Sequence, residues 1–243
     1  MKSLVYATCL VLATCLMDAR CETFKVGFYN YPPMMIESGQ TGIYQELLDE
    51  LGKMTGHRFQ VQYFPYARLA HKFDLGQIDL EPGVFPGWVK QQKVPGMFSV
   101  PFGKVVDTLV FAPGKHFHVN TPRDLSGRTL GLVRGYIYPD LRELFDSGVV
   151  HRADAVSETQ LLAMLAAGRM DQILINKAVA QYSIVQVPKY RDFVVGDVVG
   201  AFDVSIRVHP SKKALLPALD DAILAMKRSG AIARIYSKYG VSL

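Results

Sequence analysis

The sequence predicts an α/β fold built from two similar lobes. Between residues 24 and 80, apolar segments with strand and helix patterns alternate in the order β-α-β-α-β, which is typical of a parallel sheet with crossover helices. A second series with the same alternation runs from 129 to 175. A short pattern also occurs twice, because helix-Gly76-x-x-Asp79-strand recurs as helix-Gly168-x-x-Asp171-strand. This repetition suggests that one α/β turn is used once in each of two lobes.

The first series follows from hydrophobic periodicity and from residues that end elements. Strand segments alternate apolar with other residues, and the first helix has leucines at helical spacing. Proline stands near the start of the second helix, where it is tolerated, and glycine ends both helices. The expected elements are strands at 24–29, 59–64 and 78–80, and helices at 43–54 and 65–73.

The third strand leads into a Pro- and Gly-rich loop that carries Phe85 and Trp88. Ligands of open α/β sheets lie in the crevice outside the carboxyl ends of the strands. We therefore expect this loop to form one wall of a ligand site. A β-rich run at 105–111 then carries the chain away to the second series.

The second series contains its own capping and stop signals. Ser157 and Gln160 form a capping-box pattern ahead of a leucine-rich helix, which ends at Gly168. The expected elements are strands at 129–133, within 149–156, at 173–175, 193–199 and 202–208, and helices at 139–145, 157–168, 212–229 and 231–238.

Composition excludes several classes of protein. The 243 residues are 49% hydrophobic and 20% charged, which is ordinary for a globular chain. The net charge of +5 is spread without a Lys/Arg block, so we expect no nucleic-acid partner. We expect a monomer.

Residues 1–21 have the pattern of a secretory signal peptide. Lys2 precedes an apolar core at 4–17, and residues 19–21 form a small-x-small cleavage site. Two alternatives stay open, an N-terminal anchor helix and a lipoprotein anchor at Cys15. All three cysteines lie in this segment, so cleavage after Cys21 leaves a chain without disulfide, thiolate ligand or cysteine nucleophile. We expect export to the periplasm.

Several motifs resemble the family 3 periplasmic solute-binding proteins, the receptors of bacterial ABC transporters. They are Gly76-x-Ile78-Asp79 after a helix, Phe98-Ser99-x-Pro101-Phe102 after the loop, and the helical pattern over 215–240. The resemblance implies a type II periplasmic binding protein-like fold, in which two α/β lobes are joined by two hinge-crossing strands. Lobe 1 would comprise 22–108 plus 203–243, and lobe 2 would comprise 109–202. A ligand would bind between lobes that close over it.

The sequence departs from relatives that bind α-amino acids. In those proteins an Arg after the third-strand loop holds the carboxylate, and an Asp at a second-lobe strand end holds the ammonium. Here the loop at 88–93 has no Arg, and the strand ends in Asn176. A neutral Asn cannot neutralise a buried ammonium. We therefore expect a ligand other than an α-amino acid held in the usual way.

Other residues are candidates for the site. Arg68 begins a helix and Arg134 follows a second-lobe strand, where an Arg fork and helix N–H groups favour an anion. Surface or hinge ion pairs are the alternative role for both. Glu81 either faces the cleft or caps a turn, and the aromatic residues are candidate walls. The predicted ligand-binding residues are Tyr31, Arg68, Glu81, Trp88, Arg134, Tyr136 and Asn176.

The predicted function is capture of a small polar or anionic, amino acid-like compound for ABC-type uptake. The sequence has no Gly-x-Ser-x-Gly, Walker or His-Glu-x-x-His motif, so no catalytic residue is assigned. His116-x-His118 has no evident third ligand, so we expect no metal and no cofactor. Two alternatives remain, a periplasmic dehydratase-like enzyme on the same scaffold and a ligand-sensing module that acts on a membrane sensor.

Overall fold

The computed structural model describes residues 21–241 of the chain. The predicted signal peptide lies outside these residues except for Cys21, which is exposed. Within the described range, no helix has the length and apolar character needed to cross a membrane.

The order of elements follows the predicted alternation. The strands are β1 (Thr23–Phe28), β2 (Arg58–Tyr63), β3 (Leu80–Val84), β4 (Met97–Phe98), β5 (Gly103–Phe111), β6 (Thr129–Val133), β7 (His151–Ala155), β8 (Gln172–Asn176) and β9 (Val194–Val208). The α-helices are α1 (Ile43–Thr55), α2 (Tyr66–Asp74), α3 (Pro86–Val89), α4 (Arg142–Asp146), α5 (Glu158–Ala166), α6 (Lys177–Gln186), α7 (Leu216–Arg228) and α8 (Ala231–Lys238).

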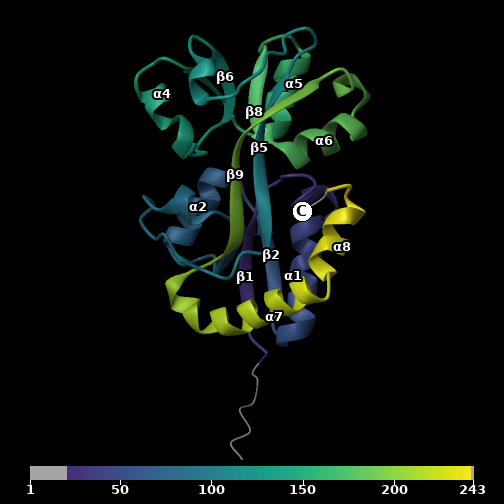
Figure 1. Ribbon diagram of the computed structural model, residues 1–243. Helices are drawn as coiled ribbons and strands as arrows, with labels where there is room; N and C mark the ends of the chain where they lie inside the picture. The colour runs from purple at the N-terminus through teal and green to yellow at the C-terminus, as the bar shows by residue number, and fades with distance from the viewer. Residues whose placement is uncertain (1–20, 242–243) are drawn as a thin grey trace, which may run out of the picture.

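The strands form two parallel groups joined by two long antiparallel strands. β1 pairs with β2 and β3 in parallel in the lower lobe of Figure 1, and β6 pairs with β7 and β8 in parallel in the upper lobe. β5 and β9 pair antiparallel with each other and run through both lobes. The strand order β2-β1-β3-β9-β5-β8-β6-β7 therefore confirms the predicted two-lobed α/β fold with two crossing strands.

The second crossing strand differs from the prediction. Two separate β-rich segments are predicted, at 193–199 and 202–208, but β9 is one strand of 15 residues. Gly200 lies inside it and pairs with Asp107 of β5, where the register shifts at a β-bulge. A bulge bends a strand and re-aims its side chains, which suits a strand that passes between lobes. The lobe limits at 108/109 and 202/203 stay a prediction.

The repeated glycine motif has the same geometry in both lobes. Gly76 and Gly168 both adopt a φ of +67°, a left-handed conformation that favours glycine. The N–H of each glycine bonds back to a carbonyl of the preceding helix, and so does the N–H of the next residue, as in a Schellman motif. Each glycine thus ends a helix and turns the chain into the next strand.

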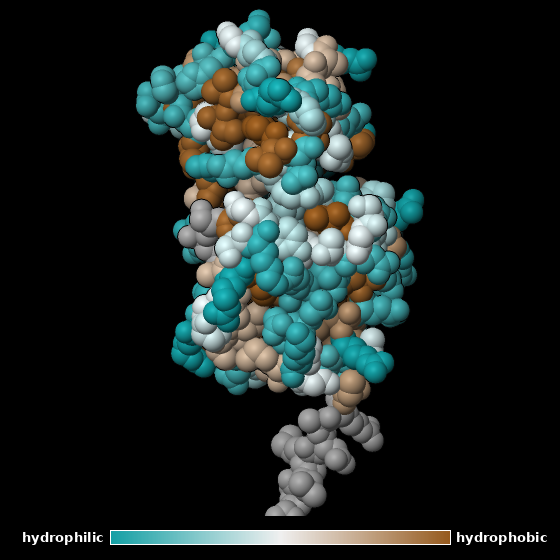
Figure 2. Space-filling model, turned by 90° about the vertical axis from the view of Figure 1, so that its right-hand side faces the viewer, coloured by the Kyte–Doolittle hydropathy of each residue, from teal (hydrophilic) through white to brown (hydrophobic). Residues whose placement is uncertain are grey.

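Helices cover both sides of the lower lobe. α1, α7 and α8 pack together on one side of the sheet, whereas α2 buries Leu69 and Phe73 on the other side (Figure 1). The space-filling view shows the two lobes as separate masses that meet at a narrower waist (Figure 2). The largest buried apolar cluster contains residues of both lobes, such as Phe28 and Ile173, and the space between the lobes is set by the residues at their facing ends.

The helix α6 was missed by the sequence analysis. Its apolar side chains are spread around the helix and give no stripe at helical spacing. The available signal was Asn176, whose Oδ1 accepts a hydrogen bond from the Ala178 backbone N at 2.7 Å and caps the helix.

Candidate functional site

A cavity of about 60 Å³ lies between the lobes, enough for a few water molecules. Its walls come from the ends of strands β1, β3, β6 and β8, from β5, and from the first residues of α2 and α5. The lining residues are Tyr29, Tyr31, Tyr66, Glu81, Pro82, Gly83, Val84, Trp88, Val105, Asp107, Val133, Tyr136, Ile137, Tyr138, Glu158, Leu174, Ile175 and Asn176. Both lobes thus contribute to one site.

The structure brings together five of the seven predicted ligand-binding residues. Those that line the cavity are Tyr31, Glu81, Trp88, Tyr136 and Asn176. Arg68 and Arg134 are exposed and do not line it. The proposed role of these two arginines in ligand binding stays a prediction.

Tyrosines close the cavity where the two lobes meet. The Tyr136 hydroxyl of lobe 2 donates a hydrogen bond to the Tyr29 hydroxyl of lobe 1 at 3.0 Å. The Tyr136 ring also packs edge-on against Tyr66, with centroids 5.2 Å apart. A second contact between lobes joins Arg142 Nη2 to Gln91 Oε1 at 3.0 Å. The lobes are therefore in contact around the cavity.

Asn176 presents an unused hydrogen-bond donor at this site. It is the last residue of β8 and is 4% exposed. Its Oδ1 is occupied by the Ala178 N–H, which fixes the orientation of the amide. Its Nδ2 has no hydrogen-bond partner among the described residues. A buried donor without a partner costs about 1–3 kcal/mol, so a ligand oxygen bonded to it would be stabilising.

Two carboxyl groups in the cavity have strongly raised pKa values. Burial raises the pKa of Asp107 to about 7. Burial also raises the pKa of Glu158 to about 7, with a smaller contribution from Asp107, while a hydrogen bond to its own backbone and one with Tyr136 oppose the rise. Burial raises the pKa of Tyr138 well above its usual range, and the charge of Asp107 raises it further. Asp107 and Glu158 form no ion pair within residues 21–241.

Glu81 is held by a buried arginine. Arg207 Nη1 lies 2.9 Å from Glu81 Oε2, and the two side chains are 0% and 5% exposed. The other guanidinium nitrogens of Arg207 bond to Gln92 and to the carbonyls of Val94 and Pro95. Burial raises the pKa of Glu81, and the Arg207 charge opposes that rise. Arg207 therefore fixes Glu81 and the loop that follows α3.

The sequence analysis missed Asp107, Tyr66, Tyr138 and Glu158 as lining residues. Glu158 follows the end of β7 and the cap residue Ser157, so its place after a strand was a usable signal. Asp107 lies inside the β-rich run predicted at 105–111, and an acidic residue within such a strand gives no periodic signal. Arg207 sits within an apolar run, and only the fold reveals that Glu81 is its partner.

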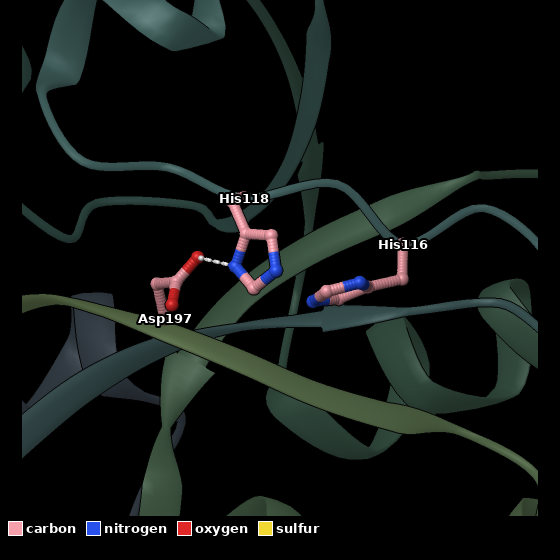
Figure 3. A group of neighbouring side chains, drawn as sticks. All are labelled: His116, His118 and Asp197. Carbon is pink, nitrogen blue, oxygen red and sulfur yellow. Dashed lines mark ion pairs between the residues drawn. The ribbon is translucent and has the colours of Figure 1, made fainter.

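A second cluster lies on lobe 2, away from the cavity. His116 and His118 approach Asp197 of β9, and their potential ligand atoms lie within 4.8 Å of one another (Figure 3). His118 Nδ1 is 3.4 Å from Asp197 Oδ2, which also accepts a hydrogen bond from the Val119 backbone N at 2.8 Å. These contacts fasten the loop to β9. Asp197 is the third group that the sequence did not reveal, and the expected absence of a metal stays a prediction.

Comparison with known proteins gives a family match and several structural likenesses. Residues 24–242 match the model of the bacterial extracellular solute-binding proteins, family 3. A search of curated protein sequences returned no match.

Three solved structures share the fold. An ancestral arginine-binding protein bound to arginine aligns with a TM-score of 0.75 and 21% identity, covering 89% of this chain and 97% of the other. A histidine kinase sensor domain aligns with a TM-score of 0.78 and 20% identity, covering 92% of this chain and 97% of the other. An ancestral amino acid-binding protein described as a precursor of cyclohexadienyl dehydratase aligns with a TM-score of 0.72 and 18% identity. The alignment covers 89% of this chain and 95% of the other.

Proposed function

The chain belongs to the bacterial extracellular solute-binding proteins of family 3, and from this premise we propose that it captures a small polar compound of amino acid size between its lobes. We further propose that it is exported to the periplasm as a monomer and delivers the compound to an ABC-type permease. In this proposal the lobe limits are 22–108 plus 203–243 for lobe 1, and 109–202 for lobe 2.

The unpartnered donor of Asn176 in the cavity carries this proposal. A structural Asn at the start of a helix needs only its capping oxygen, and that oxygen is already bonded to Ala178. The Nδ2 group is nevertheless buried beside tyrosines and carboxyl groups from both lobes. Polar groups that converge on a partly aromatic cavity are typical of a small-molecule site.

Closure of the lobes about the hinge links ligand binding to recognition by a partner. β5 and β9 join the lobes, and the Tyr136–Tyr29 contact forms only when the lobes approach. A ligand that touches both walls binds the closed form better and shifts the population toward it. A permease can then distinguish the loaded protein by the relative position of its lobes.

A sensing module is the second candidate, because a histidine kinase sensor domain has the same fold over 97% of its own length. In that case the closed form would act on a membrane sensor instead of a permease. Deleting the gene and measuring both uptake of the ligand and ligand-dependent transcription would separate the two.

A dehydratase-like enzyme is the third candidate, since Asp107 and Glu158 have the pKa of about 7 that suits acid–base work. We propose that the protein is not an enzyme. The test is recovery of the bound compound after prolonged incubation, since a chemically altered compound would favour the enzyme.

A thermal-shift screen of residues 22–243 tests the proposed function. The panel contains amino acids, di-acids, polyamines, amino alcohols and aromatic acids. A ligand at a hundredfold excess over its Kd should stabilise the protein by about 2.7 kcal/mol. If no compound shifts the Tm, and no small molecule co-purifies with the protein by mass spectrometry, the proposed function is wrong.

A further inference from the structure

The charges that line the cavity are of one sign. Three acidic residues line it, namely Glu81, Asp107 and Glu158, and the same lining contains no Lys, Arg or His. Only Glu81 has a charged partner, Arg207, which lies behind the wall and is fully buried. Asp107 and Glu158 are therefore without a counter-charge among the described residues.

The aromatic residues that line the cavity also favour a positively charged ligand. Six aromatic residues surround the cavity, namely Tyr29, Tyr31, Tyr66, Trp88, Tyr136 and Tyr138. The faces of such rings carry negative potential and attract ammonium groups. Tyr29 packs against both Tyr31 and Tyr66 with centroids 5.4 Å apart, so these rings form one connected wall.

An anion would find no comparable support. A ligand carboxylate in this cavity would lie beside two carboxyl groups without a cation to neutralise it, and a buried unpaired charge is costly. The one unpartnered group, Asn176 Nδ2, is a neutral donor and suits a hydroxyl or carbonyl oxygen.

We infer that the ligand is a small organic cation, a primary or quaternary ammonium compound with one neutral oxygen acceptor and no carboxylate. Asp107 and Glu158 face the ammonium, the tyrosines surround it, and Asn176 donates to the oxygen. This inference rests on the proposed function and departs from the anionic alternative within the small polar or anionic class that the sequence predicted.

Matched probes test the inference by isothermal titration calorimetry on the refolded, ligand-free protein. Ethanolamine and choline each carry an ammonium group and a hydroxyl, whereas 1-propanol and 3,3-dimethyl-1-butanol are their neutral counterparts. Succinate and alanine supply an anion and a zwitterion. We expect at least one ammonium probe to bind, and its neutral counterpart to bind at least about 10-fold more weakly.

Substitutions then locate the binding. At pH 8, above the pKa of about 7 of both carboxyl groups, Asp107→Asn and Glu158→Gln should each weaken binding of the ammonium probe by about 10-fold or more. Each substitution removes one negative charge with little change in size. Asp146→Asn and Glu143→Gln remove matched carboxylates from exposed positions of α4 and should leave the affinity unchanged.

The outcomes separate this inference from the proposed function. Binding of succinate or alanine, with no binding of either ammonium probe, would overturn the ligand class and leave the solute-binding function intact. Ammonium binding that survives both cavity substitutions would also overturn it. If no probe binds and no compound of the wider screen shifts the Tm, both the inference and the proposed function are wrong.

Discussion

Tyr136 of lobe 2 and Tyr29 of lobe 1 are joined by a hydrogen bond of 3.0 Å between their hydroxyl groups. The two residues come from strand ends that lie 107 positions apart in the chain and belong to different lobes. This bond is therefore a direct indicator of lobe closure, and removing it should change the balance between closed and open forms.

The substitution Tyr136→Phe keeps the ring and removes the hydroxyl. We expect a loss of about 0.5–1.5 kcal/mol of closed-state stability, the usual net value of one hydrogen bond. Small-angle X-ray scattering of the ligand-free protein should then give a larger radius of gyration. Tyr182→Phe on α6 is the control, because the Tyr182 hydroxyl forms no hydrogen bond with any residue of the range 21–241. Equal scattering from both variants would show that the Tyr136–Tyr29 contact does not control closure.

The raised pKa values of Asp107 and Glu158 predict the pH dependence of stability. Between about pH 4 and pH 7 both groups are protonated in the folded protein and ionised in the unfolded chain. The unfolded chain then binds fewer protons, so the free energy of unfolding falls as the pH rises through this window. Ligand-free protein should thus be less stable at pH 8 than at pH 5 as far as these two groups are concerned.

Asp107→Asn should remove part of that dependence. One pKa unit corresponds to about 1.4 kcal/mol, so we expect the variant to be about 1–3 kcal/mol more stable than the parent at pH 8. At pH 4 the two proteins should be equal. Urea unfolding at both pH values measures this, with Asp146→Asn as control. Parallel pH profiles for parent and Asp107→Asn would contradict the assigned burial of Asp107.

Most of the fold could be predicted from the sequence because each lobe has its own alternation of strand and helix patterns. The left-handed φ of a Schellman turn favours glycine at positions 76 and 168. The repeated turn could therefore be recognised in the sequence from these two glycines. By contrast, α6 has apolar residues on all sides, and β9 continues through Gly200 because β5 supplies its partner over most of its length. Such features depend on contacts between distant segments.

The site was predictable in part, for a similar physical reason. Tyr31, Trp88, Tyr136 and Asn176 follow strands or lie in turns at strand ends, and strand ends meet at the cleft. Arg68 and Arg134 also lie near strand ends, yet both side chains are exposed. The direction of the Arg68 side chain depends on the rotation of α2 against the sheet, and that of Arg134 on the turn that follows β6. Local sequence fixes neither.

The buried pair of Glu81 and Arg207 should be important for stability. Glu81→Gln leaves the guanidinium of Arg207 fully buried without a negative partner, and breaking such a pair costs about 3–5 kcal/mol. Glu50→Gln, at an exposed ion pair with Lys53, should cost less than about 1 kcal/mol. Chemical denaturation measures both. A cost for Glu81→Gln as small as that for Glu50→Gln would mean that Arg207 gains solvent or another partner.

Asn176 has two roles that substitutions can separate. Asn176→Ser keeps a capping oxygen for α6 and removes the Nδ2 donor, so stability should change by only a few tenths of a kcal/mol. Binding of ethanolamine or choline, whichever binds the parent, should weaken by about 1–3 kcal/mol because the ligand oxygen loses its partner.

Asn176→Ala removes the cap as well and should also lower the free energy of unfolding by about 1 kcal/mol. Calorimetric titration and urea unfolding of both variants give the comparison. If Asn176→Ser binds the ligand as well as the parent does, the buried donor is not part of the binding site. The Asn176 side chain would then serve only to cap α6.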